Sequence, residues 1–125
     1  MDFDVAVIGG GSAGYAAAST AQSLGARVAI VDPGPLGGLC ILKGCMPTKT
    51  ILRSSDIMAL MRRAEEFGLQ PIQPHADLSA INDRKNKLIQ EFAEYRIQQL
   101  NDPRFTLIPE PAEFLSPHEI RIGNQ

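Results

Sequence analysis

Val7-Ile8-Gly9-Gly10-Gly11-Ser12-Ala13-Gly14 is the stretch that decides the fold of this chain. It completes an apolar run from Phe3 to Ile8 that is typical of a buried strand. Gly9, Gly11 and Gly14 then follow the G-x-G-x-x-G spacing. In that pattern the first glycine permits a tight turn, the second lets the backbone approach a pyrophosphate, and the third lets the next helix pack closely on the sheet. The stretch therefore predicts a strand, a turn and a helix that together bind a dinucleotide.

The sequence on the far side of this loop has the order that the motif requires. An alanine-rich segment from Tyr15 to Leu24 predicts a helix, and Gly25 is typical of its C-terminal cap. A second apolar run then ends at Asp32, 18 residues beyond Gly14 (32 − 14), close to the usual position of a ribose-binding carboxylate. The diphosphate is expected at the N-terminus of the first helix, where free N–H groups attract anions. The alternative for Asp32 is a solvated acid at the start of a Pro-Gly-Pro turn.

A second motif, Cys40-Ile-Leu-Lys-Gly-Cys45-Met-Pro-Thr-Lys49, holds the only two cysteines of the chain. Residues 46–67 have the pattern of a helix, and Pro47 suits its first turn. Cys45 would then lie at a helix N-terminus, a position that lowers a thiol pKa and stabilises the thiolate. Gly44 gives the loop the freedom to bring Cys40 back to Cys45. The pair is interpreted as redox-active.

Three other fates of the two cysteines were weighed. A structural zinc site needs about four ligands, and His75 and His118 lie in distant segments, so no metal site is expected. A structural disulfide is disfavoured because Asp2 and Asp4 stand where a secretory leader would be basic, which favours a reducing, cytoplasmic compartment. A pair of inert buried thiols is the remaining alternative.

Taken together, the motifs resemble the N-terminal segment of the class I pyridine nucleotide–disulfide oxidoreductases, which include dihydrolipoamide dehydrogenase, glutathione reductase and mercuric reductase. The resemblance covers roughly the first 50 residues and rests on Val7 to Gly14, Asp32, Leu36-Gly37-Gly38, Cys40, Gly44-Cys45 and Pro47-Thr48-Lys49. It implies FAD as the dinucleotide, with NADH or NADPH as the electron donor of the complete enzyme. Dihydrolipoamide dehydrogenase is the member that the chain is expected to resemble most.

The family also implies roles for individual residues of this sequence. Asp32 would bind the adenosine ribose, and Ala112 would offer a backbone contact at the adenine end of FAD. The diphosphate would be met by Gly9, Gly11, Ser12, Ala13 and Gly14, and the flavin side would be lined by Gly37, Gly38 and Leu39. Leu39 stands where the family usually has a threonine, so one hydroxyl contact to the cofactor would be missing.

The redox roles follow from the same resemblance. Cys45 would stack against the flavin ring, and Lys49 would lie near flavin N5. Cys40 would be the more accessible thiol of the complete enzyme and would attack the substrate, a small-molecule disulfide or another electron acceptor. A competing hypothesis is a non-catalytic dinucleotide-binding module with structural or regulatory cysteines, in which Lys49 would have no task.

The predicted fold class is α/β: a Rossmann-like, three-layer FAD-binding domain with a parallel sheet, helices and a small β-meander. Residues 1–125 would form its N-terminal part and leave it incomplete. The NAD-binding and dimerisation domains of the family are expected to be absent from this chain, and the isolated fragment is expected to be inactive. By resemblance, the full-length protein would be a homodimer.

The rest of the chain is interpreted as scaffold. Met58 and Met61 are expected to fill a core, and Asp77 is expected to cap a helix that runs to about Leu100. The apolar seam of that helix is predicted to consist of Leu78, Ile81, Leu88, Phe92 and Tyr95. His75 and His118 are expected in a loop and a hairpin turn, and three short strands are expected at 105–108, 112–115 and 119–122.

The composition excludes two classes of partner. The formal net charge is -2 and the pI is about 5.6. Acids flank the basic run Arg84-Lys85-Asn86-Lys87, so we interpret it as a solvated helix face and expect no nucleic acid. No run of 18 apolar residues occurs, so no membrane span is expected. With 44% hydrophobic and 21% charged residues, the chain is typical of an ordinary soluble domain.

Overall fold

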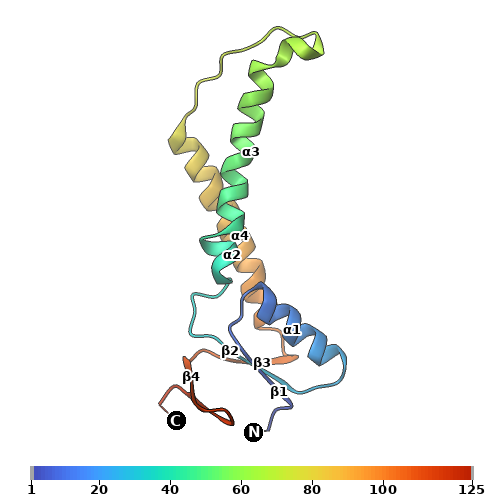
Figure 1. Ribbon diagram of the computed structural model, residues 1–125, viewed down its shortest axis with the longest axis vertical. Coiled ribbons are helices and arrows are strands. Elements are labelled where there is room, and N and C mark those ends of the chain that lie inside the picture. Colours follow the sequence, from blue (N-terminus) through green and yellow to red (C-terminus); the bar gives the residue numbers. More distant parts are fainter. Residues whose placement is uncertain (1, 125) are drawn as a thin grey trace.

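The computed structural model describes residues 2–124, and it has two distinct regions (Figure 1). One region is a small parallel sheet with a helix packed on it, next to a β-hairpin that holds the C-terminal residues. The other is a long helical hairpin that projects away from the sheet. The glycine loop and the cysteine loop both lie where these two regions join.

The sheet has three parallel strands in the order β1-β2-β3. They are β1 (Val5–Ile8), β2 (Val28–Val31) and β3 (Phe105–Ile108). All four residues of β2 are buried, as expected for a central parallel strand. The prediction that the first strand is buried was wrong: Ile8 is 46% exposed, because β1 is the edge of the described sheet and has a partner on one side only.

Helix α1 (Ser12–Ser23) follows the glycine loop and packs on β1 and β2. Its fully buried Ala18 joins Val28, Ile30, Phe105 and Leu100 in the core cluster. The C-cap residue is Leu24, and Gly25 follows it in the terminating turn, with a φ of 89° that suits glycine and an N–H that donates to the Gln22 carbonyl. The small side chains of α1 therefore set its close approach to the sheet.

The projecting region consists of α2 (Gly38–Leu42), α3 (Cys45–Arg62), the short 3₁₀ helix η1 (Ala64–Phe67) and α4 (Leu78–Leu100). The predicted cap of α4 is confirmed, because the Ala80 N–H donates to Asp77 Oδ1 at 3.0 Å. His75 lies in the loop that joins η1 to α4, as predicted. Arg84 of α4 ties the two long helices together by donating to the Thr50 carbonyl at 3.1 Å. The last turn of α4 enters the core through Leu100.

The predicted packing of these helices was only partly right. No residue of α3 is buried, and Met61 is 36% exposed, so the methionines do not fill a core. Ile81 and Leu88 are half-buried, in line with the predicted seam. Its other members are exposed, namely Leu78 (76%), Tyr95 (61%) and Phe92 (43%). The reason is that α2 and α3 pack against one side of α4 only. Apolar side chains on that side are covered, and those farther round the helix are exposed to solvent.

The three C-terminal strands do not form one meander. β3 pairs with β2 in the parallel sheet, and only β4 (Ala112–Ser116) and β5 (Glu119–Ile122) pair with each other, antiparallel. His118 lies in the turn between them, as predicted. Residues 105–108 thus join the parallel sheet as its second edge strand, and β4 turns away to pair with β5 alone. The α/β class with a parallel sheet and helices is confirmed, with a hairpin in place of the meander.

Within residues 2–124, no helix is both long enough and apolar enough to cross a bilayer.

Candidate functional site

The glycine loop holds α1 against the end of β1. A Cβ atom added at Gly14 would lie 1.8 Å from the Gly9 carbonyl oxygen and 3.3 Å from Val7 Cγ1. Only glycine allows this approach, as the third glycine of the motif predicts. The loop is therefore a packed joint between strand and helix.

The N-terminus of α1 presents unpaired amide donors. The Tyr15 N–H donates to the Gly11 carbonyl at 2.9 Å and makes the first intrahelical bond. The N-cap residue Gly11 supplies no side-chain cap, and the first turn contains no acid. The amides of Ser12, Ala13 and Gly14 thus lack intrahelical acceptors, as the first N–H groups of any helix do. This arrangement suits an anion such as a diphosphate.

Asp32 is tied to the same loop. Its Oδ2 accepts the Gly10 N–H at 2.5 Å, and its Oδ1 accepts the Gly34 N–H at 2.8 Å. The carboxylate therefore lies at the loop, and each oxygen keeps a lone pair for a hydroxyl group. The bond from Gly34 is the one expected if Asp32 opens the Pro-Gly-Pro turn, whereas the bond from Gly10 links Asp32 to the glycine loop 22 residues away. Ribose binding by Asp32 stays a prediction.

Gly10 was missed as a site residue. Its N–H holds Asp32, and a Cβ atom there would lie 3.0 Å from Leu100 Cδ1. Leu100 is fully buried and packs next to Gly10 of the glycine loop. The sequence feature that could have indicated it is the unbroken Gly9-Gly10-Gly11 run. The motif accepts any residue at the middle position, so a glycine there was not required by it.

A second backbone contact joins the glycine loop to the cysteine segment. A Cβ atom at Gly38 would lie 2.6 Å from Gly11 Cα, closer than a real Cβ contact. Gly37 and Gly38 also have φ values of 128° and 73°, which side chains rarely adopt. Leu39 is the next residue of α2 and is exposed. The residues expected on the flavin side thus lie against those expected at the diphosphate.

The two cysteines come together across Gly44. A Cβ atom at Gly44 would lie 3.0 Å from the Leu39 carbonyl oxygen and 3.4 Å from Cys40 Cα, so the start of α3 packs on the backbone of α2. Cys45 is the first residue of α3, as predicted. Both cysteines are free thiols. The packing at Gly44 therefore holds the segment that carries Cys40 against the start of α3, which carries Cys45.

The hydrogen bond with Cys45, followed by partial desolvation, raises the pKa of the Cys40 thiol above its ordinary value. Cys40 therefore holds its proton more tightly than an ordinary cysteine does. Cys45 is exposed in this chain and Cys40 is half-buried. Greater accessibility of Cys40 in a complete, flavin-bound enzyme stays a prediction.

Lys49 is exposed near the start of α3, four residues after Cys45. Residues four apart lie on the same face of a helix. Lys49 therefore projects from the helix face that carries Cys45. Its expected place near flavin N5 stays a prediction.

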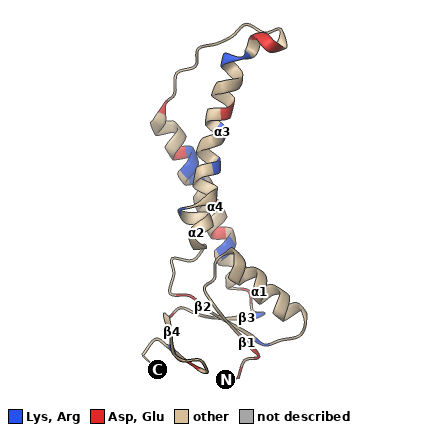
Figure 2. Ribbon diagram, viewed as in Figure 1, with Lys and Arg blue, Asp and Glu red and all other residues tan. Residues whose placement is uncertain are grey.

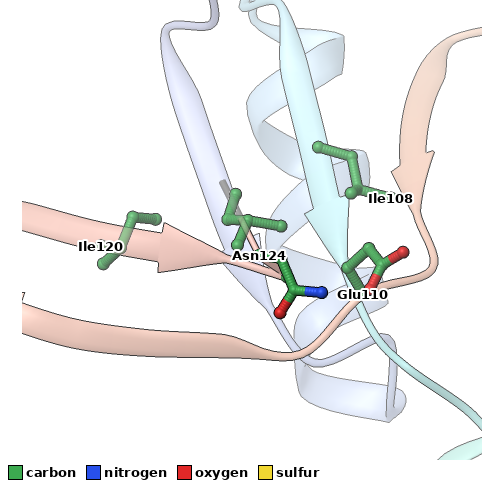
Figure 3. Close-up of a pocket in the computed structure, with 6 residues that line it drawn as sticks. Ile108, Glu110, Ile120 and Asn124 are labelled. Carbon is green, nitrogen blue, oxygen red and sulfur yellow. The ribbon is translucent and has the colours of Figure 1, made fainter.

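Ala112 is the one site residue away from this joint. The Asp32 N–H donates to the Ile108 carbonyl at 3.0 Å, so Asp32 is linked to the end of β3. Ala112 follows at the start of β4 and lines a cavity of about 420 Å³. A neighbouring cavity of about 590 Å³ is surrounded by Ile108, Glu110, Ile120 and Asn124 (Figure 3). The expected contact of Ala112 with the adenine end of FAD stays a prediction.

Metal-binding side chains do not gather in the described part of the chain: residues 2–124 contain no group of three or more His, Cys, Asp and Glu that could hold an ion.

Comparison with known proteins gives a consistent result. The family model described as pyridine nucleotide-disulphide oxidoreductase matches residues 3–122. The chain is 34% identical over 125 residues to a mercuric reductase of Staphylococcus aureus, covering 99% of this chain and 23% of that protein. It is 36% identical over 92 residues to a dihydrolipoyl dehydrogenase of Bacillus subtilis, covering 74% of this chain and 19% of that protein.

A dihydrolipoyl dehydrogenase of Zymomonas mobilis is 42% identical over 91 residues, covering 73% of this chain and 20% of that protein. Among solved structures, the Cu(II) complex of the HOCl-induced flavoprotein disulfide reductase RclA from Escherichia coli superposes with a TM-score of 0.72 at 29% identity. That match covers 94% of this chain and 24% of the other. The chain therefore spans about a fifth to a quarter of the length of the proteins that it matches.

Proposed function

The chain belongs to the pyridine nucleotide-disulphide oxidoreductase family, and from this premise we propose that it is the FAD-binding, thiol-bearing N-terminal part of a flavoprotein that reduces a disulfide with NADH or NADPH. The observation that carries the proposal is the backbone contact between Gly11 and Gly38. It joins a loop suited to a dinucleotide diphosphate to the helix that carries Cys40. Neither motif alone connects cofactor binding to thiol chemistry.

The residues present fit FAD. The uncapped first-turn amides of α1 would hold the diphosphate, and Asp32, fixed by Gly10 and Gly34, would accept from ribose hydroxyls. The backbone of Gly37 and Gly38 would line the flavin side. When bound, FAD supplies two-electron transfer between a nicotinamide and a thiol pair. Lys49 would place a positive charge on the face that carries Cys45.

The chemistry of this chain itself is thiol–disulfide exchange. A thiolate of the reduced pair attacks a sulfur of the acceptor, which breaks the acceptor's S–S bond and releases one thiol after protonation. The second cysteine then attacks the mixed disulfide, releases the second thiol and leaves a Cys40–Cys45 disulfide. Two electrons and two protons pass to the acceptor. We favour Cys40 as the attacking residue of the complete enzyme.

A disulfide is the favoured acceptor. The family whose model matches is described by its disulfide chemistry. Identity does not separate the two kinds of relative, because over similar lengths a mercuric reductase is 34% identical and a dihydrolipoyl dehydrogenase is 33% identical. Mercuric ion is the second candidate acceptor. The whole protein is proposed to be a homodimer with separate NAD-binding and dimerisation domains, because the matched proteins are four to five times longer than the matched segment.

A non-catalytic dinucleotide-binding module is a second candidate function. It is favoured by the raised pKa of the Cys40 thiol, which lowers the share of reactive thiolate at neutral pH. In that case Cys40 and Cys45 would neither receive nor pass on electrons when FAD and a reductant are supplied.

The proposal is tested by FAD titration of the chain, followed by flavin fluorescence. Gly11 has a φ of -68°, and a Cβ atom there meets only Gly38 Cα at an ordinary 3.7 Å, so Gly11→Ala should fold normally. It should weaken FAD binding at least about tenfold, because the added methyl group fills the space of the diphosphate. Gly11→Val should abolish binding.

Gly25→Ala is the matched control. Its Cβ atom would meet nothing within 4 Å, but its φ of 89° is costly for alanine. We expect Gly25→Ala to lose stability and keep FAD affinity, the opposite of Gly11→Ala. Unchanged FAD affinity in a folded Gly11→Val variant would refute the assignment of the loop to the diphosphate.

A further inference from the structure

A cavity of about 450 Å³ with a mixed apolar and polar lining adjoins the cysteine loop on the side of α4. Its lining differs from the residues assigned to FAD. Leu42 and Lys43 come from the segment between the two cysteines, and Pro47 comes from the first turn of α3. The polar lining from α4 consists of Lys85, Asn86 and Gln90.

The charge of this cavity is positive. Two of its lining residues, Lys43 and Lys85, are cationic, and none is acidic. Figure 2 shows one basic segment beside α2 and another higher on α4. Every ion pair within residues 2–124 uses an arginine, namely Arg27, Arg63, Arg104 and Arg121. The two lysine ammonium groups are therefore not neutralised by a carboxylate in the described part of the chain.

The hydrogen bonds of the cavity leave that charge in place. Lys85 Nζ donates to the neutral Asn82 Oδ1 at 2.6 Å, which orients the ammonium group without cancelling its charge. Gln90 Nε2 donates to Glu94 Oε1 at 2.8 Å, and Glu94 is not part of the lining. The side-chain amide of Asn86 adds a neutral donor. Ammonium and amide donors in a partly apolar cavity suit a carboxylate carried on an organic group.

We propose that this cavity binds an anionic group of the disulfide acceptor and so directs its S–S bond to the cysteine pair. The inference rests on the proposed function and names the class of its substrate: a disulfide with carboxylate groups. Leu42 and Pro47 would pack on the organic body, while Lys43 and Lys85 would meet the carboxylates. Lys43 lies in the loop between the two cysteines and Pro47 lies two residues after Cys45, while neither cysteine lines the cavity itself, so the acceptor's S–S bond would reach the thiols from the edge of the cavity.

The test uses the reduced chain and two disulfide reagents, without flavin or nicotinamide. The reagents are 5,5′-dithiobis(2-nitrobenzoate), which is dianionic, and 2,2′-dithiodipyridine, which is neutral. In both reactions the dithiol is oxidised to the Cys40–Cys45 disulfide and the reagent is reduced to two thiols. The measured quantity is the ratio of the two rate constants. The ratio cancels any effect of a lysine on thiol pKa, because both reagents react with the same thiolate.

We expect Lys43→Gln and Lys85→Gln each to lower the ratio about fivefold, as the loss of one close charge predicts. Lys85→Arg should keep most of it. Lys87→Gln is the matched control, since it removes the same charge from α4 two residues away but outside the lining, and it should change the ratio less than about twofold. In 1 M salt, where the Debye length is about 3 Å, the differences between variants should largely vanish.

Equal losses in Lys87→Gln, Lys43→Gln and Lys85→Gln would refute the cavity, because a diffuse field would then explain the preference. Unchanged ratios in the double variant Lys43→Gln/Lys85→Gln would refute it as well. Circular dichroism of each variant checks that the fold is kept. Lys85→Arg keeps the positive charge, so it separates the loss of charge at residue 85 from a change in structure there. Failure of the chain to bind FAD would refute the proposed function and leave these ratios unaffected, so the two failures are distinguishable.

Discussion

Replacing Gly14 with alanine tests the joint on which the site depends. The added Cβ atom would lie 1.8 Å from the Gly9 carbonyl oxygen, whereas real Cβ contacts are almost never shorter than 3.0 Å, so α1 and the loop must separate by about 1.2 Å. Overpacking of this kind typically costs about 1–3 kcal/mol, and a backbone neighbour that cannot rotate away favours the upper end. Alanine is better than glycine inside a helix by about 1 kcal/mol. The net loss expected for Gly14→Ala is therefore about 2 kcal/mol.

Thermal unfolding without cofactor measures this loss. For a chain of this size, about 2 kcal/mol corresponds to a fall in Tm of roughly 6–12 °C. Gly11→Ala is the matched control, because its Cβ atom makes an ordinary contact at 3.7 Å, and its Tm should change by only a few degrees. A Gly14→Ala variant as stable as the wild type, or more stable, would refute the close approach of α1 to Gly9. In that case overpacking would contribute nothing, and only the higher helix propensity of alanine would affect the free energy of unfolding.

Three further outcomes follow from the geometry. Leu100→Ala should cost about 2–5 kcal/mol in denaturant unfolding because Leu100 is fully buried under the glycine loop; a loss below about 1 kcal/mol would contradict its place in the core. In the reduced chain near neutral pH, iodoacetamide followed by mass mapping should label Cys45 before Cys40, because Cys45 is exposed and the pKa of Cys40 is raised; first labelling of Cys40 would contradict both observations. Hydrogen bonds from Arg27 lower the pKa of Asp4 to about 2. This pair therefore stabilises the fold above about pH 4, and the stabilisation is lost as the pH falls toward 2. An NMR titration should show that the Asp4 pKa returns toward its ordinary value in Arg27→Gln, and an unchanged pKa would show that the pair does not form in solution.

Local signals in the sequence predicted the elements of the sheet and the cysteine loop. A strand is central only when another strand pairs with it on each side, and the run at residues 28–31 pairs with β1 and β3. Cys45 follows a glycine and precedes a proline in the first helical turn, so its place at the start of α3 is set by the chain around it. The Asp77 cap was predictable for the same reason, since it depends on an amide three residues away.

The errors concern partners that the local sequence does not specify. The run at residues 5–8 is as apolar as that at 28–31, but it lies at the edge of the described sheet. The spacing of Phe92 and Tyr95 shows that both lie near one side of α4, and it does not show whether another helix covers that side. Residues 105–108 look like the first strand of a meander until β2 is known to lie beside them. In each case long-range packing decides burial.

The contact between Gly11 and Gly38 explains why the two motifs are best considered as one site. If a strand–loop–helix unit only bound a nucleotide, residue 38 could carry a side chain and the cysteine helix could lie elsewhere. Instead a Cβ atom at Gly38 would lie 2.6 Å from Gly11 Cα, while one at Gly44 would lie 3.0 Å from the Leu39 carbonyl oxygen. The glycine loop therefore positions α2, and α2 positions Cys40 beside Cys45. A rigid backbone path thus runs from the amides suited to a diphosphate to the thiols, and preorganisation of this kind is what electron transfer between a bound cofactor and a thiol pair requires.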